Sequence, residues 1–193
     1  MARVSRAQSD ANRQTIEAVS ARLFREQGLR GVSVDDLMAA AGLTHGGFYG
    51  HFESKDALAG VACAQAFKQS AGRWQDRIKG RPDRPAALKA IVEAYLSRRS
   101  RDDPGNSCPI TALAGDVARE PEHKPIRAAF AAGIKEQLAV LASLQPTDDP
   151  EAARDQAVVQ LATLVGALLL ARATRGDALS QRFLDAARAH LVG

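Results

Sequence analysis

Residues 43–55, Leu-Thr-His-Gly-Gly-Phe-Tyr-Gly-His-Phe-Glu-Ser-Lys, decide the fold of this 193-residue chain. They follow residues 34–42, which read as a short helix ended by Gly42. Two short helices joined by a glycine-containing turn of about three or four residues are the sequence outline of a helix-turn-helix. The pattern therefore predicts a helix-turn-helix near the start of the chain.

The second of these helices is unusually rich in glycine. Each interior glycine costs roughly 0.5–1 kcal/mol relative to alanine, so packing from elsewhere must hold the segment in place. Phe48 and Phe52, at i and i+4, can anchor one face to the core. Gly46, Gly47 and Gly50 then leave the opposite face low enough for a large surface, and a DNA backbone is the natural candidate.

Together with its flanks, this segment resembles the TetR family of one-component transcriptional regulators, from about Gln14 to about Leu58. The residues that carry the resemblance are Ile16, Ala18, Leu23, Phe24, Gly28, Ser33, Val34, Leu37, Ala41, Gly42, Thr44, Phe48, Tyr49, His51, Phe52, Ser54 and Lys55. The resemblance implies three parts, namely a flexible tail over residues 1–10, a three-helix DNA-binding head over 11–53, and a helical ligand-binding and dimerisation domain over 54–193.

Helical periodicity fills nearly every segment between glycine and proline breakers, and strand-like alternation is absent, so we predict an all-α fold. Ser33, with Asp36 three residues on, predicts a capped second helix, and Thr44 predicts the N-cap of a third. The other helices are expected over residues 11–27, 54–79, 84–100, 109–119, 126–144, 150–175 and 179–192.

The charge fits nucleic acid as a partner without requiring it. The whole chain carries +4 and has a pI of about 9.4. Residues 1–55, however, hold seven basic and six acidic side chains, so a shaped surface must supply specificity there. Arg3 and Arg6 belong either to a disordered terminus or to an arm that follows phosphates or enters the minor groove.

In a helix-turn-helix, the N-terminal residues of the recognition helix reach the major groove, here Thr44, His45, Gly46 and Gly47. His45 is the best candidate for a base contact. Because this helix has no Arg, Asn or Gln for a bidentate contact, we expect readout of DNA shape or of thymine methyl groups.

The resemblance implies that Tyr49, His51 and Lys55 contact phosphates, and all three side chains carry hydrogen-bond donors. Ser33 lies at a helix N-terminus, where free N–H groups suit an anion. The alternatives are simple packing for Tyr49 and a polar core or capping role for His51.

A ligand pocket is expected between the long fourth helix and the helices that follow it. Its candidate lining residues are Phe67, Trp74, Tyr95, Cys108, Leu113 and Phe130, each of which could equally be ordinary core. Cys108 precedes Pro109 at a predicted helix N-cap, where a thiol pKa tends to fall. Cys108 is thus either an inert small residue or the input of a thiol-based sensor of electrophiles or oxidants.

The last two helices, over about residues 150–192, are apolar enough to form an isologous homodimer, and the alternative is that they complete a monomeric core. The first of them should be buried nearly all round.

The expected partners are double-stranded operator DNA, a second copy and an unknown small-molecule effector. Release from a pseudo-palindromic operator by that effector would make the protein a repressor. A helical binding protein or enzyme with a degenerate head is the rival class.

No enzyme, cofactor or metal site is expected, because the four histidines and two cysteines lack ligand spacing and no phosphate loop is present. The chain start lacks the apolar core of a signal peptide. The longest apolar run, residues 157–171, is shorter than the roughly 20 residues that span a bilayer. We therefore expect a cytoplasmic protein without membrane association.

Overall fold

The computed structural model describes residues 5–193, within which the regular structure is helical and no β-strand occurs, so the all-α prediction is confirmed. Arg3, assigned above to the tail, lies outside the described residues. The helices are α1 (Arg6–Gln27), α2 (Val34–Ala40), the 3-10 helix η1 (His45–Gly50), α3 (Lys55–Ile78), α4 (Arg84–Tyr95), α5 (Arg98–Asp102), the 3-10 helix η2 (Pro104–Asn106), α6 (Pro109–Arg119), α7 (Pro125–Ser143), α8 (Pro150–Ala173) and α9 (Ala178–Val192).

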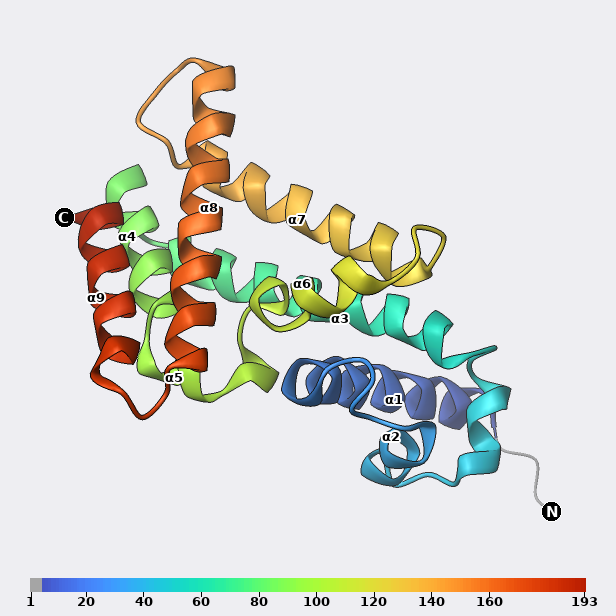
Figure 1. Ribbon diagram of the computed structural model, residues 1–193. Helices are drawn as coiled ribbons and strands as arrows, with labels where there is room; N and C mark the ends of the chain where they lie inside the picture. The colour runs from blue at the N-terminus through green and yellow to red at the C-terminus, as the bar shows by residue number, and fades with distance from the viewer. Residues whose placement is uncertain (1–4) are drawn as a thin grey trace.

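Two helical units meet along one continuous core. In Figure 1, α1, α2 and η1 form a head at one end of the molecule, and α8 and α9 lie side by side at the other end. The long helix α3 runs between them, packed against α1 on one side and α7 on the other. This arrangement makes α3 the element that physically joins the head to the rest of the chain.

The start of α2 forms as predicted. The Ser33 hydroxyl accepts a hydrogen bond from the Asp36 N–H (3.1 Å), and the Asp36 carboxylate accepts one from the Ser33 N–H (2.8 Å). This reciprocal capping box satisfies two of the free N–H groups at the helix start. The helix is therefore held at the orientation that the following turn requires.

Helix α1 begins at Arg6, five residues earlier than predicted, so residues 6–10 are helix rather than flexible tail. Its N-cap is Ser5, whose hydroxyl accepts a hydrogen bond from the Gln8 N–H (3.2 Å). The prediction relied on apolar periodicity, which these polar residues lack. A cap and the absence of breakers are sufficient to extend a helix that is already anchored downstream.

The helix predicted over residues 84–100 is broken in two. It leaves helical geometry at Leu96, and Ser97 caps the short helix α5, which covers part of the loop expected over residues 101–106. The hydroxyls of Ser97 and Ser100 both donate to the Ala94 carbonyl (2.8 Å each). Such side-chain bonds compete with the helical ladder, and two of them at one carbonyl explain the break.

The segment expected as a recognition helix is a 3-10 helix, η1, over His45–Gly50. Thr44 occupies the N-cap position but its side chain makes no capping hydrogen bond. Three glycines in six residues remove the propensity that would hold an α-helix in isolation, so the tighter turn is fixed by packing of Phe48 and Phe52.

Helix α8 is not buried all round, contrary to the prediction. Val158, Val159, Leu169 and Leu170 are exposed, and Leu179 of α9 is exposed as well. Within residues 5–193, α8 is also the one helix that is long and apolar enough to cross a membrane by length and composition alone. That criterion is weak evidence, because core helices of soluble proteins also meet it.

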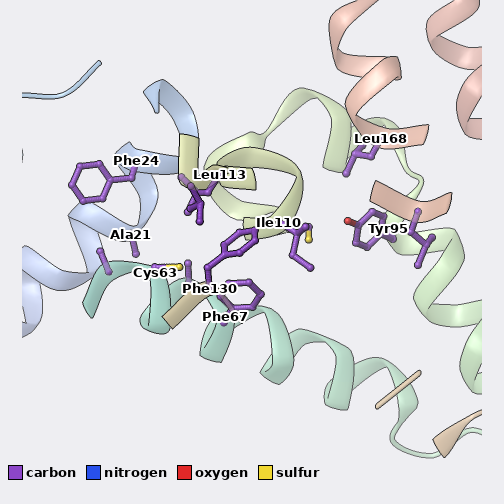
Figure 2. Packing of buried hydrophobic residues seen from close by; sticks show 14 of the residues in the cluster. Ala21, Phe24, Cys63, Phe67, Tyr95, Ile110, Leu113, Phe130 and Leu168 are labelled. Carbon is purple, nitrogen blue, oxygen red and sulfur yellow. The ribbon is translucent and has the colours of Figure 1, made fainter. Parts of the chain in front are cut away.

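The centre of the core lies where α7 crosses α3. The rings of Phe67 and Phe130 meet edge to face with centroids 5.6 Å apart, and Figure 2 shows Leu113 and Ile110 of α6 beside them. Gly133 of α7 lies directly on Phe67, since a Cβ there would come 2.1 Å from a ring atom. This close approach fixes α7 along α3 and leaves no room for a ligand at that point.

Candidate nucleic-acid interface and ligand cavity

The head presents η1 as an exposed ridge over a buried anchor. Phe48 is fully buried and Phe52 nearly so, whereas Tyr49 between them is 66% exposed. The Tyr49 ring packs edge to face on Phe48 at 5.2 Å, which orients its hydroxyl outward from a rigid base. A phenol held in this way can donate a hydrogen bond to a phosphate oxygen.

Two glycines of η1 face open space. A Cβ built on Gly46 or Gly50 meets no atom within 4 Å, and one on Gly47 meets only ordinary contacts with Met38 and Thr44. The fold itself therefore does not require glycine at positions 46 and 50. Because these two residues have no side chains, another molecule can approach the backbone of η1 closely on its outer face.

His45 and Ser33 both carry acidic neighbours. The His45 Nδ1 atom bonds the Asp35 carboxylate, and the Ser33 hydroxyl donates to the Asp36 carboxylate (2.6 Å). The Asp35 bond fixes the orientation of the imidazole and leaves Nε2 for a base edge or another partner. Ser33 is committed to its capping box, so its side chain is less available to an anion than the sequence suggested.

His51 and Lys55 lie where the head meets α3. His51 is half-buried and its carbonyl accepts a hydrogen bond from Arg13 Nη1 (2.6 Å), while the Arg13 guanidinium stacks 4.4 Å over the Phe52 ring. Lys55 is half-buried and its ammonium donates to the Leu29 carbonyl (2.7 Å). That bond uses one of three N–H groups, so a phosphate contact by Lys55 would involve the remaining two.

A cavity of about 510 Å³ lies in the larger unit, between α3, α4, α5 and the start of α6. Its lining residues are Ser70, Arg73, Trp74, Arg77, Ile91, Ala94, Tyr95, Ser97, Arg99, Ser100, Asp103, Asn106, Ser107 and Cys108. The Tyr95 hydroxyl bonds Thr111 (3.0 Å), and burial raises the pKa of this phenol. The volume is within the range of small-molecule sites, which is about 300–1,000 Å³.

The described residues contain no cluster of three or more His, Cys, Asp or Glu side chains that could hold a metal ion.

Known proteins resemble this chain both in sequence and in fold. The sequence profile of "Bacterial regulatory proteins, tetR family" matches residues 16–61, which span most of α1, all of α2 and η1, and the start of α3. This segment belongs to the tetR family. Members of this family are DNA-binding regulators rather than enzymes.

Curated relatives match less than half of this chain. The HTH-type transcriptional repressor KstR2 of Rhodococcus jostii is 32% identical over 74 residues, which are 38% of this chain and 36% of the relative. The match thus spans about a third of the relative's length.

Solved structures match over nearly the whole chain. A TetR transcriptional regulator from Chloroflexus aurantiacus is 27% identical, with a TM-score of 0.79 over 96% of this chain and 94% of that one. One from Cytophaga hutchinsonii is 24% identical, with a TM-score of 0.80 over 100% and 98%. The latter likeness concerns the fold alone.

Within this tetR-family fold, three of the six residues predicted to line a pocket do line the cavity, namely Trp74, Tyr95 and Cys108. Phe67, Leu113 and Phe130 belong instead to the α3–α6–α7 core, away from Tyr95 in Figure 2. All six fall on inward helical faces, and sequence periodicity cannot separate a core face from a cavity wall.

Neither cysteine is accessible. Cys108 forms the N-cap of α6 at the cavity wall and is 5% exposed, and Cys63 lies in the core, where burial raises its pKa to about 12. A reactive thiol needs access as well as thiolate character. The burial of Cys108 therefore does not favour the thiol-sensor interpretation.

Sequence reasoning missed the contacts that join the cavity wall to the head. The Arg25 guanidinium, on α1, donates to the Ser107 carbonyl (3.2 Å), and the Asp116 carboxylate, on α6, accepts from the Leu29 N–H (2.8 Å) just after α1. Helix α6 therefore starts at the cavity and ends on the C-terminus of α1. Periodicity gave no signal for Arg25, because it lies nine residues from Ile16 and so on about the opposite side of α1. Its partner 82 residues away could not be read from the sequence either.

Proposed function

We propose that this tetR-family protein is a cytoplasmic transcriptional repressor that binds a pseudo-palindromic DNA operator through the exposed face of η1. The main support is the pairing of the fully buried Phe48 with a neighbouring Tyr49 that is 66% exposed, beside glycines that open onto free space. Stability alone does not require the Tyr49 ring to be exposed or positions 46 and 50 to be glycine, whereas a rigid, low face with a phenol suits a phosphate backbone.

A homodimer would place two such heads on one operator. Val159 and Leu170 of α8 are exposed apolar residues, and the half-buried Gly166 lies between them at helical spacing. The groove between α8 and α9 includes Gly166 and Leu170, together with Ala162 and Leu179. An unpartnered apolar face of this kind is suited to a second copy, with two helices from each subunit. The heads would then enter successive major grooves about 34–36 Å apart.

An effector in the cavity would release the DNA by acting on the head. Ser107, in the cavity wall, accepts a hydrogen bond from Arg25 of α1. Helix α6, which begins at the cavity, also contacts the end of α1, because Asp116 accepts a hydrogen bond from the Leu29 N–H. A ligand that favours a different position of α6 or α3 would shift the equilibrium between DNA-competent and released states.

A fluorescence anisotropy titration with duplexes from the gene's own upstream region tests the proposal. Wild-type protein should bind a specific duplex with an affinity that falls steeply with salt. Tyr49→Phe removes one phosphate hydrogen bond, worth about 0.5–1.5 kcal/mol, and should weaken binding to all sequences alike by roughly 2- to 10-fold. His45→Ala should instead change the order of preference across an operator library.

Matched substitutions outside the head serve as controls. Tyr95→Phe and His123→Ala make the same chemical changes in the cavity wall and in an exposed loop, and should leave DNA affinity unaltered without ligand. Unchanged preferences in His45→Ala would reject a base-reading role for that residue. Failure of the wild-type protein to discriminate any upstream duplex from random DNA at low salt would reject the proposed function.

A further inference from the structure

The cavity is surrounded by positive charge that the fold does not neutralise. Arg73, Arg77 and Arg99 line it, and Arg25 and Arg172 bond its wall at Ser107. Against these five guanidinium groups the lining contributes one carboxylate, Asp103. Within residues 5–193, none of the five arginines forms a salt bridge with a carboxylate, and the nearby Glu26 is paired with Arg22 instead.

Three of these arginines converge on a single neutral residue. Arg25 Nη1 and Arg73 Nη2 both donate to the Ser107 carbonyl, at 3.2 and 3.3 Å, and Arg172 Nη2 bonds the Ser107 hydroxyl. Arg172 also donates to the Ser100 carbonyl (2.7 Å), while its buried Nε has no partner. Neutral oxygens satisfy hydrogen-bond geometry but leave the positive charges in excess.

The proximity of these cations is electrostatically unfavourable. Burial and then the neighbouring Arg73 together lower the pKa of Arg25 to about 10. Burial and then Arg77 likewise lower the pKa of Arg73. Like charges gathered in a partly desolvated site favour whatever anion can enter between them.

The other part of the cavity wall is apolar. The rings of Trp74 and Tyr95 lie edge to face with centroids 6.4 Å apart, and Ile91, Ala94 and Cys108 complete this side. The cavity thus has an arginine-rich part and an aromatic part within about 510 Å³. Such a division suits an amphipathic ligand whose polar end is negatively charged.

We propose that the cavity binds a small organic anion, with a carboxylate or comparable oxyanion between Arg73 and Arg77 and an apolar body against Trp74 and Tyr95. The planar guanidinium group suits an oxyanion because it offers paired N–H donors. This inference rests on the proposed function, since it names the chemical class of the effector. An anion that draws Arg73 from Ser107 acts directly at the carbonyl that Arg73 shares with Arg25 of the head.

Binding of matched acids and amides to the full-length protein, measured by calorimetry without DNA, tests the proposal. The probes are benzoate, cinnamate, 2-naphthoate and octanoate, each compared with its neutral amide of the same shape. At least one acid should bind tenfold or more tightly than its amide. Arg77→Gln and Arg73→Gln should abolish that preference, whereas Arg81→Gln, an exposed arginine just beyond α3 and outside the cavity lining, should keep it.

Folding of the variants is checked by circular dichroism. Arg77→Gln decides the test if Arg73→Gln is unstable, because it is Arg73, not Arg77, that bonds Ser107. The proposal is overturned if no acid binds more tightly than its amide, or if the preference survives in the arginine variants. Because this assay contains no DNA, its outcome is separate from the operator titration. Wild-type protein that binds DNA but shows no acid preference would overturn the anion proposal alone.

Discussion

Single residues in η1 have roles that their own packing does not explain. Phe48 is buried because the head needs an anchor, but Gly46 and Gly50 face open space and could carry a side chain without any clash. Stability alone would favour alanine at such positions. The glycines are consistent with a face shaped for a partner rather than for the fold.

Gly46→Ala should therefore separate binding from stability. The free energy of unfolding should stay constant or rise by up to about 1 kcal/mol. An added methyl group between η1 and DNA should cost about 1–3 kcal/mol of binding free energy, which is a loss of affinity of roughly 5- to 150-fold. Urea denaturation and operator titration measure the two quantities.

Gly72→Ala is the matched control, because this glycine is also exposed, on α3, and a Cβ there also meets open space. It should raise stability and leave DNA affinity unaltered. Equal DNA affinity for Gly46→Ala and wild type would show that this face of η1 does not meet DNA.

At the scale of one element, α2 depends on a titratable cap. The Ser33 hydroxyl and then the Ser33 N–H stabilise the Asp36 carboxylate and lower its pKa below 3.8. Because the pKa is lower in the folded state, the cap contributes its full stabilisation above the ordinary pKa. That contribution is lost as the pH falls through the lowered value.

A carboxyl NMR titration should place the midpoint of Asp36 below 3.8, with α2 signals shifting as the group is protonated. Ser33→Ala removes the hydroxyl that contributes most, so the Asp36 midpoint should rise toward its ordinary value. The same low midpoint in both proteins would contradict the assignment of the shift to the capping box.

Helix α6 is joined to the end of α1 by the hydrogen bond between Asp116 and the Leu29 N–H. Asp116→Ala removes the acceptor of the Leu29 N–H and should lower the free energy of unfolding by about 1–3 kcal/mol. It should also weaken the effect of a cavity ligand on DNA affinity, because α6 no longer holds the C-terminal end of α1.

Asp76→Ala changes the same side chain at an exposed position of α3 and should have little effect on either quantity. Full ligand response in Asp116→Ala would mean that coupling between cavity and head runs through other contacts, such as Arg25 and Ser107.

At the scale of the whole molecule, the end opposite the head has an apolar face without a partner. Ala162→Glu places a charge in the groove between α8 and α9 and should convert the proposed dimer to monomers, as measured by light scattering. Operator affinity should fall with it, because two linked heads bind one site far more tightly than separate heads.

Ala131→Glu is the control, since it makes the same change at an exposed position of α7 and lines no described cavity. It should remain dimeric. A wild-type protein that is monomeric at micromolar concentration and still binds a palindromic duplex tightly would contradict the dimer proposal.

The sequence by itself determined the features that depend on neighbours a few residues apart. The capping box at Ser33, the glycine stops at Gly28 and Gly42 and the helix breakers are all local, so the all-α fold and most helix boundaries could be predicted. Where prediction failed, at residues 6–10, 45–50 and 96–97, local capping bonds or distant packing overrode periodicity.

Only the tertiary structure decided which inward-facing residues border a cavity and which fill the core. Trp74 and Phe67 are both aromatic residues on the inward face of α3, so the sequence does not distinguish them. Gly133 of α7 packs directly against Phe67, whereas Trp74 borders the cavity. The arginine cluster comes from α1, α3, α5 and α8, and these helices bring their charges together only on folding. Long-range packing is the physical reason, because side chains far apart in the chain acquire their electrostatic neighbours only in three dimensions.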